Sequence, residues 1–328
     1  MKRIISASRR TDIPAFYTNW FMNRIRAGFC HWINPFGGQV YRVSLRPNDC
    51  LGIVFWTRDP RPLMPHLRFL TSEGYRFYFH FTINGYPRIL EPHRPPVEEA
   101  ITVFKRLSDA VSPELILWRY DPIVLSTATP ATYHLKQFHY LAANLSGYTR
   151  SCYFSFVNLY TKTQRNLQKV EERHGLSFYE LGPEKQLELA RQLQAIAEAY
   201  GIKLYSCCND LLVGAGIQKA RCVDRSSLDG PDSQSVCLRP APTRRGCGCL
   251  ESVDIGAYNT CVNGCIYCYA TNSRKAALKR LRSHDPCDTV LWRPSTLRQL
   301  DLIQLERTTA SADDSEHLVS VETPVWPQ

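Results

Sequence analysis

Residues 76–120 run Arg76-Phe-Tyr-Phe-His-Phe-Thr-Ile83, then a helical stretch from Pro96 to Val111, then Leu115-Ile-Leu-Trp-Arg-Tyr120. The first and last segments are almost continuously apolar, which is typical of parallel strands buried on both faces. Between them, apolar side chains recur every three or four positions, at Val97, Ile101, Phe104, Leu107 and Val111. A strand–helix–strand unit of this kind predicts an α/β fold with a parallel sheet.

The same alternation continues on both sides of this unit. Further strands are predicted at Arg3–Ser6, Val40–Leu45, Gly52–Trp56, Cys152–Leu159 and Lys203–Cys207. Helices are predicted to begin with Pro130 as a first helical residue and near Pro183, and Gly201 is expected to be the C-cap of the second.

The chain divides by composition into three predicted parts. Residues 1–210 carry the strand–helix pattern, and residues 211–285 are expected to form a cysteine-rich metal-binding segment packed on it. Within that segment, Asp224–Gly246 is rich in Ser, Pro, Gly and Arg, and we expect an irregular but ordered cap around a metal. Residues 286–328 form an extension, and its end, Thr308–Gln328, is expected to be loose.

Bulk composition limits the class of protein. The 328 residues are 44% hydrophobic, without a run of 18 apolar residues or a signal-peptide pattern, so we expect a cytoplasmic protein with no membrane span. In that compartment, 13 cysteines indicate metal ligation or buried thiols more than disulfides. The net charge of +10 is typical of nucleic-acid partners, but also of a basic surface that serves solubility or of a pocket for an anionic substrate.

The densest group of cysteines is Cys261-Val-Asn-Gly-Cys265-Ile-Tyr-Cys268. Three closely spaced thiolates can hold three irons of a four-iron four-sulfur (4Fe-4S) cluster and leave the fourth iron open. The alternative is zinc, which prefers four ligands in pairs. Cys265 and Cys268 would then form one pair, and Cys247 or Cys249 would join Cys261.

The spacing of these cysteines, with Tyr267 before the third, resembles the radical S-adenosylmethionine (radical SAM) signature, and Tyr-Cys-Tyr269 resembles its spore photoproduct lyase-like branch. Three other stretches are similar to that branch. They are Gly52-Ile-Val-Phe-Trp-Thr-Arg-Asp-Pro60, Phe79-His-Phe-Thr-Ile-Asn84 with the Leu90-Glu-Pro92 and Pro96-Val-Glu98 that follow it, and Trp118-Arg-Tyr-Asp-Pro-Ile123.

The order of these stretches departs from ordinary radical SAM proteins, in which the cysteine loop follows the first barrel strand. Here the loop comes last, as in an uncharacterised bacterial family whose opening resembles Ser6-Ala-Ser-Arg-Arg-Thr-Asp-Ile-Pro-Ala-Phe-Tyr17. The similarity runs from about Ile4 to Ala270. It implies a TIM-like partial (β/α) barrel, permuted relative to ordinary radical SAM proteins.

The resemblance also implies a reaction. S-adenosylmethionine (SAM) would chelate the open iron, and one electron, supplied by a donor such as a ferredoxin or flavodoxin, would yield a 5′-deoxyadenosyl radical. No Gly-Gly-Glu follows the cysteine loop, so SAM binding comes from the resemblance alone. The rival hypothesis is a non-catalytic iron–sulfur or zinc protein that senses redox state or binds nucleic acid.

In a barrel, reactive groups lie at the carboxyl ends of strands. Candidate cofactor-binding residues there are Thr57, Arg58, Asn84, Arg119 and Asp121, together with Tyr267 of the cysteine loop. Arg119 and Asp121 could grip the carboxylate and ribose of SAM, or pair with each other.

Arg9, Arg10 and Asp12 directly follow the first predicted strand and are candidates for the substrate site. Two arginines at a strand end could hold a carboxylate or phosphate. The alternative is an Arg–Asp pair that fixes the loop.

A second group of cysteines comprises Cys208, Cys222, Cys247 and Cys249. These four thiols could bind a second iron–sulfur cluster or a zinc ion. In the alternative interpretation Cys207 and Cys208 end a buried strand and Cys222 is a core residue.

Overall fold

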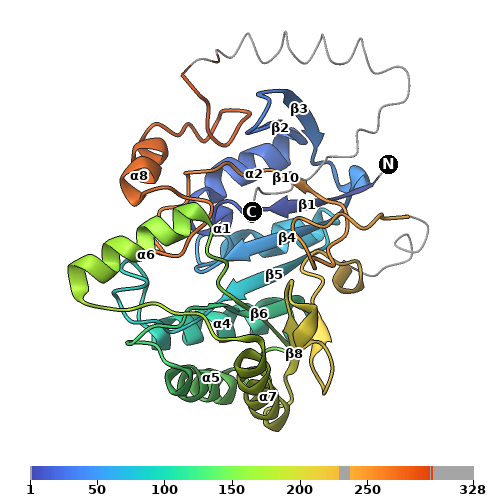
Figure 1. Ribbon diagram of the computed structural model, residues 1–328. Helices are drawn as coiled ribbons and strands as arrows, with labels where there is room; N and C mark the ends of the chain where they lie inside the picture. Colours follow the sequence, from blue (N-terminus) through green and yellow to red (C-terminus); the bar gives the residue numbers. More distant parts are fainter. Residues whose placement is uncertain (1, 229–236, 296, 298–328) are drawn as a thin grey trace.

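A parallel sheet forms the centre of the protein (Figure 1). The computed structural model describes residues 2–228, 237–295 and 297 of the chain. Within this part, eight strands lie in the order β10-β1-β4-β5-β6-β7-β8-β9, and every neighbouring pair is parallel. The strands are β1 (Arg3–Ala7), β4 (Cys50–Thr57), β5 (Phe77–Thr82), β6 (Ile116–Ile123), β7 (Ser151–Phe156), β8 (Lys203–Ser206), β9 (Gln218–Lys219) and β10 (Val253–Asp254). The predicted α/β class with a parallel sheet is confirmed.

One predicted strand has a different role from the one expected. Val40–Leu45 forms β3 (Val40–Ser44), but this strand pairs antiparallel with β2 (Phe29–Ile33) in a separate two-stranded sheet. Only Val40 and Val43 of β3 are buried, whereas Tyr41 and Arg42 are exposed. A strand with one covered face suits a hairpin on the surface and not the buried parallel sheet.

Helices cover one face of the sheet. Strand residues such as Phe55, Phe79, Trp118 and Phe154 share a core with them. The helices of this layer are α1 (Ile13–Phe16), α2 (Thr18–Ala27), α3 (Leu67–Ser72), α4 (Val97–Val111), α5 (Ala131–Leu145) and α7 (Pro183–Ala199). Pro130 is the N-cap residue of α5 instead of its first helical residue, and Tyr200 is the C-cap of α7, one residue before the predicted Gly201.

Two more helices lie towards the edge to which the arrowheads of β1, β4 and β5 point, namely α6 (Thr161–His174) and α8 (Arg274–Arg282) (Figure 1). Short 3-10 helices connect other elements: η1 (Pro47–Asp49), η2 (Met64–His66), η3 (Pro113–Leu115), η4 (Asp210–Leu212) and η5 (Ser226–Leu228). In the described residues, no helix has the length and apolar character that crossing a membrane requires.

The other face of the sheet is covered by the chain that follows β8. Val54, Tyr78, Leu117 and Tyr153 pack there against side chains from this segment, namely Cys207, Ala220, Cys222, Val223, Leu228, Leu238 and Cys249. The described part of Asp224–Gly246 is largely irregular, as predicted, apart from η5. Residues 229–236 and the expected loose end, Thr308–Gln328, lie outside the described residues.

Candidate metal centre

The cysteine loop leaves the sheet at its carboxyl edge. β10 pairs with β1 through Ile5 with Val253 and Ser6 with Asp254, so the two strands run in the same direction. The chain then forms the loop that contains Cys261, Cys265 and Cys268 and enters α8 (Figure 1). Parallel strands present their carboxyl ends at one edge, and in α/β proteins this edge carries the reactive groups.

Asp254 ties this loop to the amino-terminal strand. Its carboxylate accepts hydrogen bonds from Ser6 Oγ (3.0 Å), Ser8 Oγ (2.5 Å), the Arg9 N–H (2.8 Å) and the Gly256 N–H (3.0 Å). Burial alone would raise the pKa of Asp254, but Arg10 and these donors outweigh it and hold the pKa below its ordinary value. An ionised side chain therefore joins segments from the two ends of the chain.

The three cysteines of the loop are half-buried, and Cys268 influences the pKa of the other two. Burial raises the pKa of Cys265 to about 11, against the opposing effect of Arg58, and Cys268 adds to the rise. Burial also raises the pKa of Cys261, with further contributions from Asp12, Cys268 and Cys265. The pKa of Cys261 responds to both other thiols and that of Cys265 to Cys268, so the three side chains lie near one another.

Tyr267 anchors the loop to the ends of β4 and β5. Its hydroxyl accepts hydrogen bonds from Arg58 Nη2 (2.7 Å) and Asn84 Nδ2 (3.1 Å) and donates one to Glu91. Arg58 also forms an ion pair with Glu91. Burial would raise the pKa of Glu91, but Arg58 and Arg94 outweigh it and lower the pKa. Three residues predicted at a cofactor site, Arg58, Asn84 and Tyr267, are thus brought into one network.

Asp12 connects the other side of the loop to β4. It accepts hydrogen bonds from Thr57 Oγ1 (2.7 Å), the Arg58 N–H (2.8 Å) and Asn263 Nδ2 (3.2 Å). Asn263 lies between the first two cysteines of the loop and also accepts from Arg94 Nη1 (2.8 Å). Burial raises the pKa of Asp12, opposed by the hydrogen bonds from Thr57 and Arg58. Asp12 and Thr57 therefore help to position the cysteine loop.

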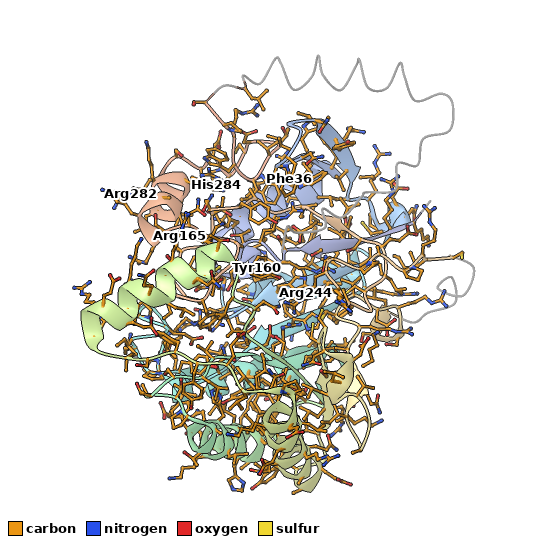
Figure 2. All side chains as sticks on the ribbon, in the orientation of Figure 1. Phe36, Tyr160, Arg165, Arg244, Arg282 and His284 are labelled. Atoms are coloured by element: carbon orange, nitrogen blue, oxygen red, sulfur yellow. The ribbon has the colours of Figure 1, made fainter. Side chains whose placement is uncertain are left out.

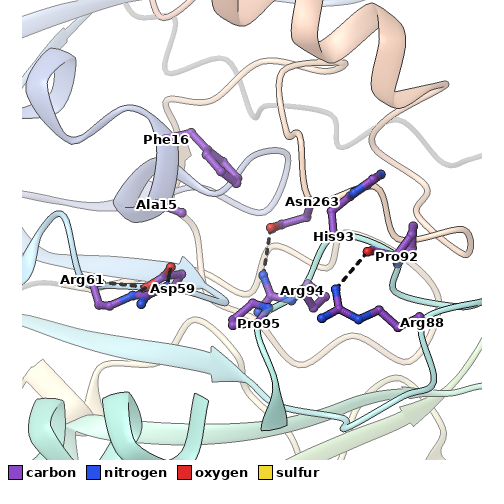
Figure 3. A pocket seen from close by; sticks show the side chains of 10 residues that line it. All are labelled: Ala15, Phe16, Asp59, Arg61, Arg88, Pro92, His93, Arg94, Pro95 and Asn263. Atoms are coloured by element: carbon purple, nitrogen blue, oxygen red, sulfur yellow. Dashed lines mark hydrogen bonds and ion pairs between the residues drawn. The ribbon is translucent and has the colours of Figure 1, made fainter. Parts of the chain in front are cut away.

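A pocket of about 410 Å³ opens beside the loop (Figure 3). Asn263 forms part of its wall, and Arg61, Arg88 and Arg94 supply most of its charge. Asp59 pairs with Arg61, whereas Arg88 and Arg94 donate to neutral oxygens of Pro92, Asn263 and Arg58. Excess positive charge in a pocket favours an anionic group on a ligand.

The second group of cysteines gathers under the other face of the sheet, and Cys207 joins it. Sγ of Cys207 lies 3.6 Å from Sγ of Cys208 and 3.6 Å from Sγ of Cys222. The neighbouring thiols Cys207 and Cys247 raise the pKa of Cys208, and Cys207 and Cys249 raise the pKa of Cys222. These five thiols therefore lie in one group, which we call the five-thiol ring.

Three arginines face the five-thiol ring. Arg119 Nη1 donates to Cys222 Sγ (3.2 Å), and Arg244 Nη2 lies 3.7 Å from Cys207 Sγ. Figure 2 labels Arg244, whose side chain lies over the strands of the sheet. Burial would lower the pKa of the half-buried Arg9, but Cys249, Asp254 and Cys222 outweigh it and raise the pKa, so Arg9 lies near these groups. Arg119 also pairs with Asp121 at 2.6 Å.

The predicted substrate residues are not brought together as a set. Asp12 contacts the cysteine loop through Asn263, and Arg9 faces the five-thiol ring. The Arg10 guanidinium lies over the rings of Trp32 (5.5 Å) and Tyr258 (5.1 Å). Arg119 and Asp121, predicted at the cofactor site, pair with each other beside the second group of cysteines.

Several residues of these sites were missed by sequence reasoning. Glu91 lies in the Leu90-Glu-Pro92 stretch that carried the resemblance, but a lone glutamate gave no sign of its role. Arg94 and Arg244 do not belong to any motif that pointed to a role in these sites. Cys207 was interpreted as the end of a buried strand, although its neighbour Cys208 was already a candidate ligand.

As the side chains stand, no group of three or more His, Cys, Asp or Glu within residues 2–228, 237–295 and 297 surrounds a point where a metal ion would bind. The two groups of cysteines are therefore close sets of potential ligands and not preformed coordination spheres.

A protein-family model described as "Domain of unknown function (DUF1848)" matches residues 4–270. The chain belongs to this family. The matched range agrees with the one expected from the sequence, Ile4 to Ala270, and includes the described residues of both cysteine groups. A search of curated proteins finds no match.

Proposed function

We propose that the protein is an iron–sulfur enzyme of the radical SAM type, with a 4Fe-4S cluster held by Cys261, Cys265 and Cys268. The observation that carries the proposal is the position of the loop. It leaves the carboxyl end of a parallel strand, continues into a helix and brings three thiols together there. In the radical SAM proteins that the sequence resembles, the cysteine loop also follows a strand of the sheet.

The topology supports a partial barrel that is permuted relative to those proteins. From β1 to β9, each strand of the sheet joins the same growing edge, without the reversal that defines doubly wound folds. When right-handed crossovers all run in one direction, their helices lie on one face of the sheet. Here the helices share one core with strand residues, which fits this arrangement. β10, which precedes the cysteine loop, lies beside β1. This is the position that the first barrel strand would have in ordinary radical SAM proteins.

The donor set fits a cluster better than a single ion. In a 4Fe-4S cluster each thiolate binds a different iron, so the three sulfurs surround the cluster without touching one another. No hydrogen bond among the described residues joins the sulfurs of Cys261, Cys265 and Cys268 directly, although they are near enough to influence each other's charge. Three thiols without a fourth in the same loop would leave one iron free.

The surroundings suit a charged cofactor. When bound, the reduced cluster would supply one electron that breaks a carbon–sulfur bond of SAM, giving methionine and a 5′-deoxyadenosyl radical. Arg94, held by Asn263 of the loop and by the carbonyl of Arg58, would attract the SAM carboxylate. Tyr267 and Asn84 fix the loop against β5, and the burial of Tyr267 keeps water from this side. The electron would come from a donor such as a ferredoxin or flavodoxin.

Anaerobic reconstitution with iron and sulfide tests the proposal. We expect about four irons and four sulfides per chain. After reduction in the presence of SAM, the protein should release 5′-deoxyadenosine. Cys265→Ala should lose most of the iron and all of this product.

A matched control is Cys152→Ala, which removes a thiol that is buried in β7 away from both cysteine groups. This variant should keep iron and product formation. A fully loaded cluster that never yields 5′-deoxyadenosine would contradict the enzyme proposal. Zinc without sulfide, lost in Cys265→Ala, would contradict the cluster itself.

A further inference from the structure

Three sulfurs of the five-thiol ring have the spacing of ligands in a mononuclear metal site. Sγ of Cys207 lies 3.6 Å from Sγ of Cys208 and 3.6 Å from Sγ of Cys222. A tetrahedral zinc ion with Zn–S bonds of 2.3 Å holds its sulfurs about 3.8 Å apart. A disulfide would need about 2.05 Å, and all five cysteines are free thiols. The thiolates of a 4Fe-4S cluster cannot touch one another, so this group differs in kind from the cysteine loop.

The backbone is shaped to bring these sulfurs together. Cys208 has a φ of +60°, a left-handed conformation that is unfavourable for a non-glycine residue. This bend lets two consecutive side chains, Cys207 and Cys208, reach the same ring. Such conformations persist where the surrounding structure enforces them, which is common at functional sites.

The Cys247-Gly-Cys249 turn packs closely against the neighbouring backbone, which also brings its sulfurs to the ring. A Cβ on Gly246, whose φ is +73°, would lie 3.1 Å from the carbonyl oxygen of Cys208. A Cβ on Gly248 would lie 3.0 Å from the carbonyl oxygen of Ala220. Two glycines therefore allow the turn to press against the chain on both sides, and this contact closes the ring.

The arginine side chains around the five-thiol ring favour an anion there. Nη2 of Arg9 is buried and has no hydrogen-bond partner, although Arg9 lies near Cys249 and Cys222. Arg119 and Arg244 approach Cys222 and Cys207. Arg119 already pairs with Asp121 and Arg9 lies near Asp254, but Nη2 of Arg9 would be left unsatisfied beside neutral thiols. A zinc ion with four thiolates carries two net negative charges and would provide the missing partner.

Further donors point at individual sulfurs. The Val223 N–H lies 3.4 Å from Cys249 Sγ, and Thr243 Oγ1 lies 3.5 Å from Cys247 Sγ. Hydrogen bonds of this kind orient and stabilise thiolate ligands in metal sites.

We propose that four thiols of the five-thiol ring bind one structural zinc ion: Cys222, Cys247, Cys249 and one of the adjacent pair Cys207 and Cys208. A tetrahedral ion takes four ligands, and the backbone bend at Cys208 lets either member of the pair complete the set. The sulfurs do not yet surround a common point, so binding involves rotation of these side chains. This site is independent of the function proposed for the cysteine loop.

The ion has a clear structural task. The segment after β8 covers the second face of the sheet with few large apolar residues in its described part, chiefly Val223, Leu228 and Leu238. Small units with little apolar surface commonly depend on a metal to fold. Zinc would join the end of β8, the residue Cys222 and the Cys247–Cys249 turn into one cap.

The test uses the full chain with Cys261, Cys265 and Cys268 all replaced by Ala, which removes the other candidate site. We expect one zinc per chain and no sulfide in this background. Cys222→Ala and Cys249→Ala should each lower the zinc content at least fivefold, whereas Cys152→Ala should keep it. Cobalt in place of zinc should give the strong visible absorption of a tetrahedral thiolate site.

Each alternative outcome decides against the proposal. Iron with equimolar sulfide in the triple-alanine background would indicate a second cluster. Absence of zinc, with all five thiols reacting freely with a thiol reagent in folded protein, would show that the ring is a packing arrangement. Retention of zinc in a variant with both Cys207 and Cys208 replaced by Ala would overturn the ligand assignment.

Should a cysteine variant fail to fold, chelation of the unsubstituted protein replaces it. Removal of zinc should then expose residues 220–228 and 237–250 to protease, and added zinc should restore protection. Unchanged protease resistance after complete removal of zinc would refute a structural role.

Discussion

Tyr267 shows how one side chain between two cysteines fixes the whole loop. Its hydroxyl lies among Arg58, Asn84 and Glu91 and is the only part of the side chain that forms hydrogen bonds in the described structure. The ring itself packs with Tyr86 and Leu90 in a small apolar cluster. The ring contributes burial, and the hydroxyl in addition orients the cysteine loop, because its three partners lie together at one place at the ends of β4 and β5.

We expect Tyr267→Phe to destabilise the protein by about 2 kcal/mol, because it leaves buried partners without a hydrogen bond. Tyr269→Phe is the matched control. Tyr269 is 40% exposed and its hydroxyl makes one bond, to the carbonyl oxygen of Arg9 (2.8 Å), so its loss should cost less than about 1 kcal/mol. Urea denaturation of both variants measures the difference. Equal losses would show that the Tyr267 network contributes little.

Glu91→Gln tests the ion pair beneath Tyr267. Arg58 and Glu91 are 11% and 5% exposed, and replacing one partner of a buried pair leaves an uncompensated charge. We expect a loss of about 3 kcal/mol in the free energy of unfolding. Glu99→Gln breaks the Arg61–Glu99 pair, which is more than 40% exposed on both sides, and should cost about 0.5 kcal/mol. Thermal or urea unfolding would contradict the argument if Glu99→Gln cost as much as Glu91→Gln.

At the scale of elements, apolar runs predicted the strands of the sheet well. The segments that became β4 to β8 are long enough and buried enough on both faces to be visible as strands. β9 and β10 were missed because each has two residues, and a pair of residues carries no period. Their pairing depends on neighbours far away in sequence.

The candidate sites show the same limit. Spacing alone predicted Cys261, Cys265 and Cys268 as one group, because a short loop keeps them together. Cys207 and Arg9 could not be assigned to the second group from sequence, since β1, β8 and the Cys247–Cys249 turn meet only in the folded sheet. Long-range contacts of this kind leave no local pattern.

Helix α5 carries a pH-sensitive contact with β6. His134 is fully buried, and burial lowers its pKa to about 4. Its Nε2–H donates to the carbonyl of Val124 (3.1 Å), so Nδ1 accepts from the hydroxyl of Tyr120 (2.9 Å). Protonation of Nδ1 would remove this acceptor. The folded protein therefore holds His134 in its neutral form.

Stability should fall as the pH is lowered from about 6.5 to about 4, because the unfolded chain takes up this proton first. The pKa difference corresponds to about 3 kcal/mol from His134 alone. His134→Gln should be less stable at pH 7 but depend less steeply on pH in this range. His139→Gln, on the exposed side of the same helix, should keep the steep dependence. Equal slopes for wild type and His134→Gln would refute the assignment.

At the scale of the whole molecule, the chain brings its late residues back to its beginning. β10 joins β1 through only two residue pairs, and Asp254 adds bonds to Ser6, Ser8 and Arg9. Tyr17 Oη also donates to the carbonyl of Thr260 (2.8 Å) in the loop. The unit β10–cysteine loop–α8 is thus attached at the edge of a sheet that is otherwise formed by residues 3–219.

This arrangement predicts that the order of the chain can be changed without changing the fold. We expect a circular permutant that begins at Ser252, with Gln328 joined to Met1, to form the same sheet and bind the same iron. A longer connection between the joined ends adds little entropy cost. Its free energy of unfolding should lie within about 2 kcal/mol of that of the natural order.

A second permutant that begins at Val262 separates Cys261 from Cys265 and serves as the control. It should keep the circular dichroism of the α/β sheet but lose iron, because the loop no longer holds its three thiols together. Circular dichroism and iron–sulfide analysis on both permutants distinguish the two effects. Were the Ser252 permutant unable to fold while the Val262 permutant folds, the β10–cysteine loop–α8 unit would depend on its covalent link to the preceding segment. The permuted-barrel interpretation would then be wrong, since that interpretation requires the contact with β1, and not the connection at residue 252, to position the cysteine loop.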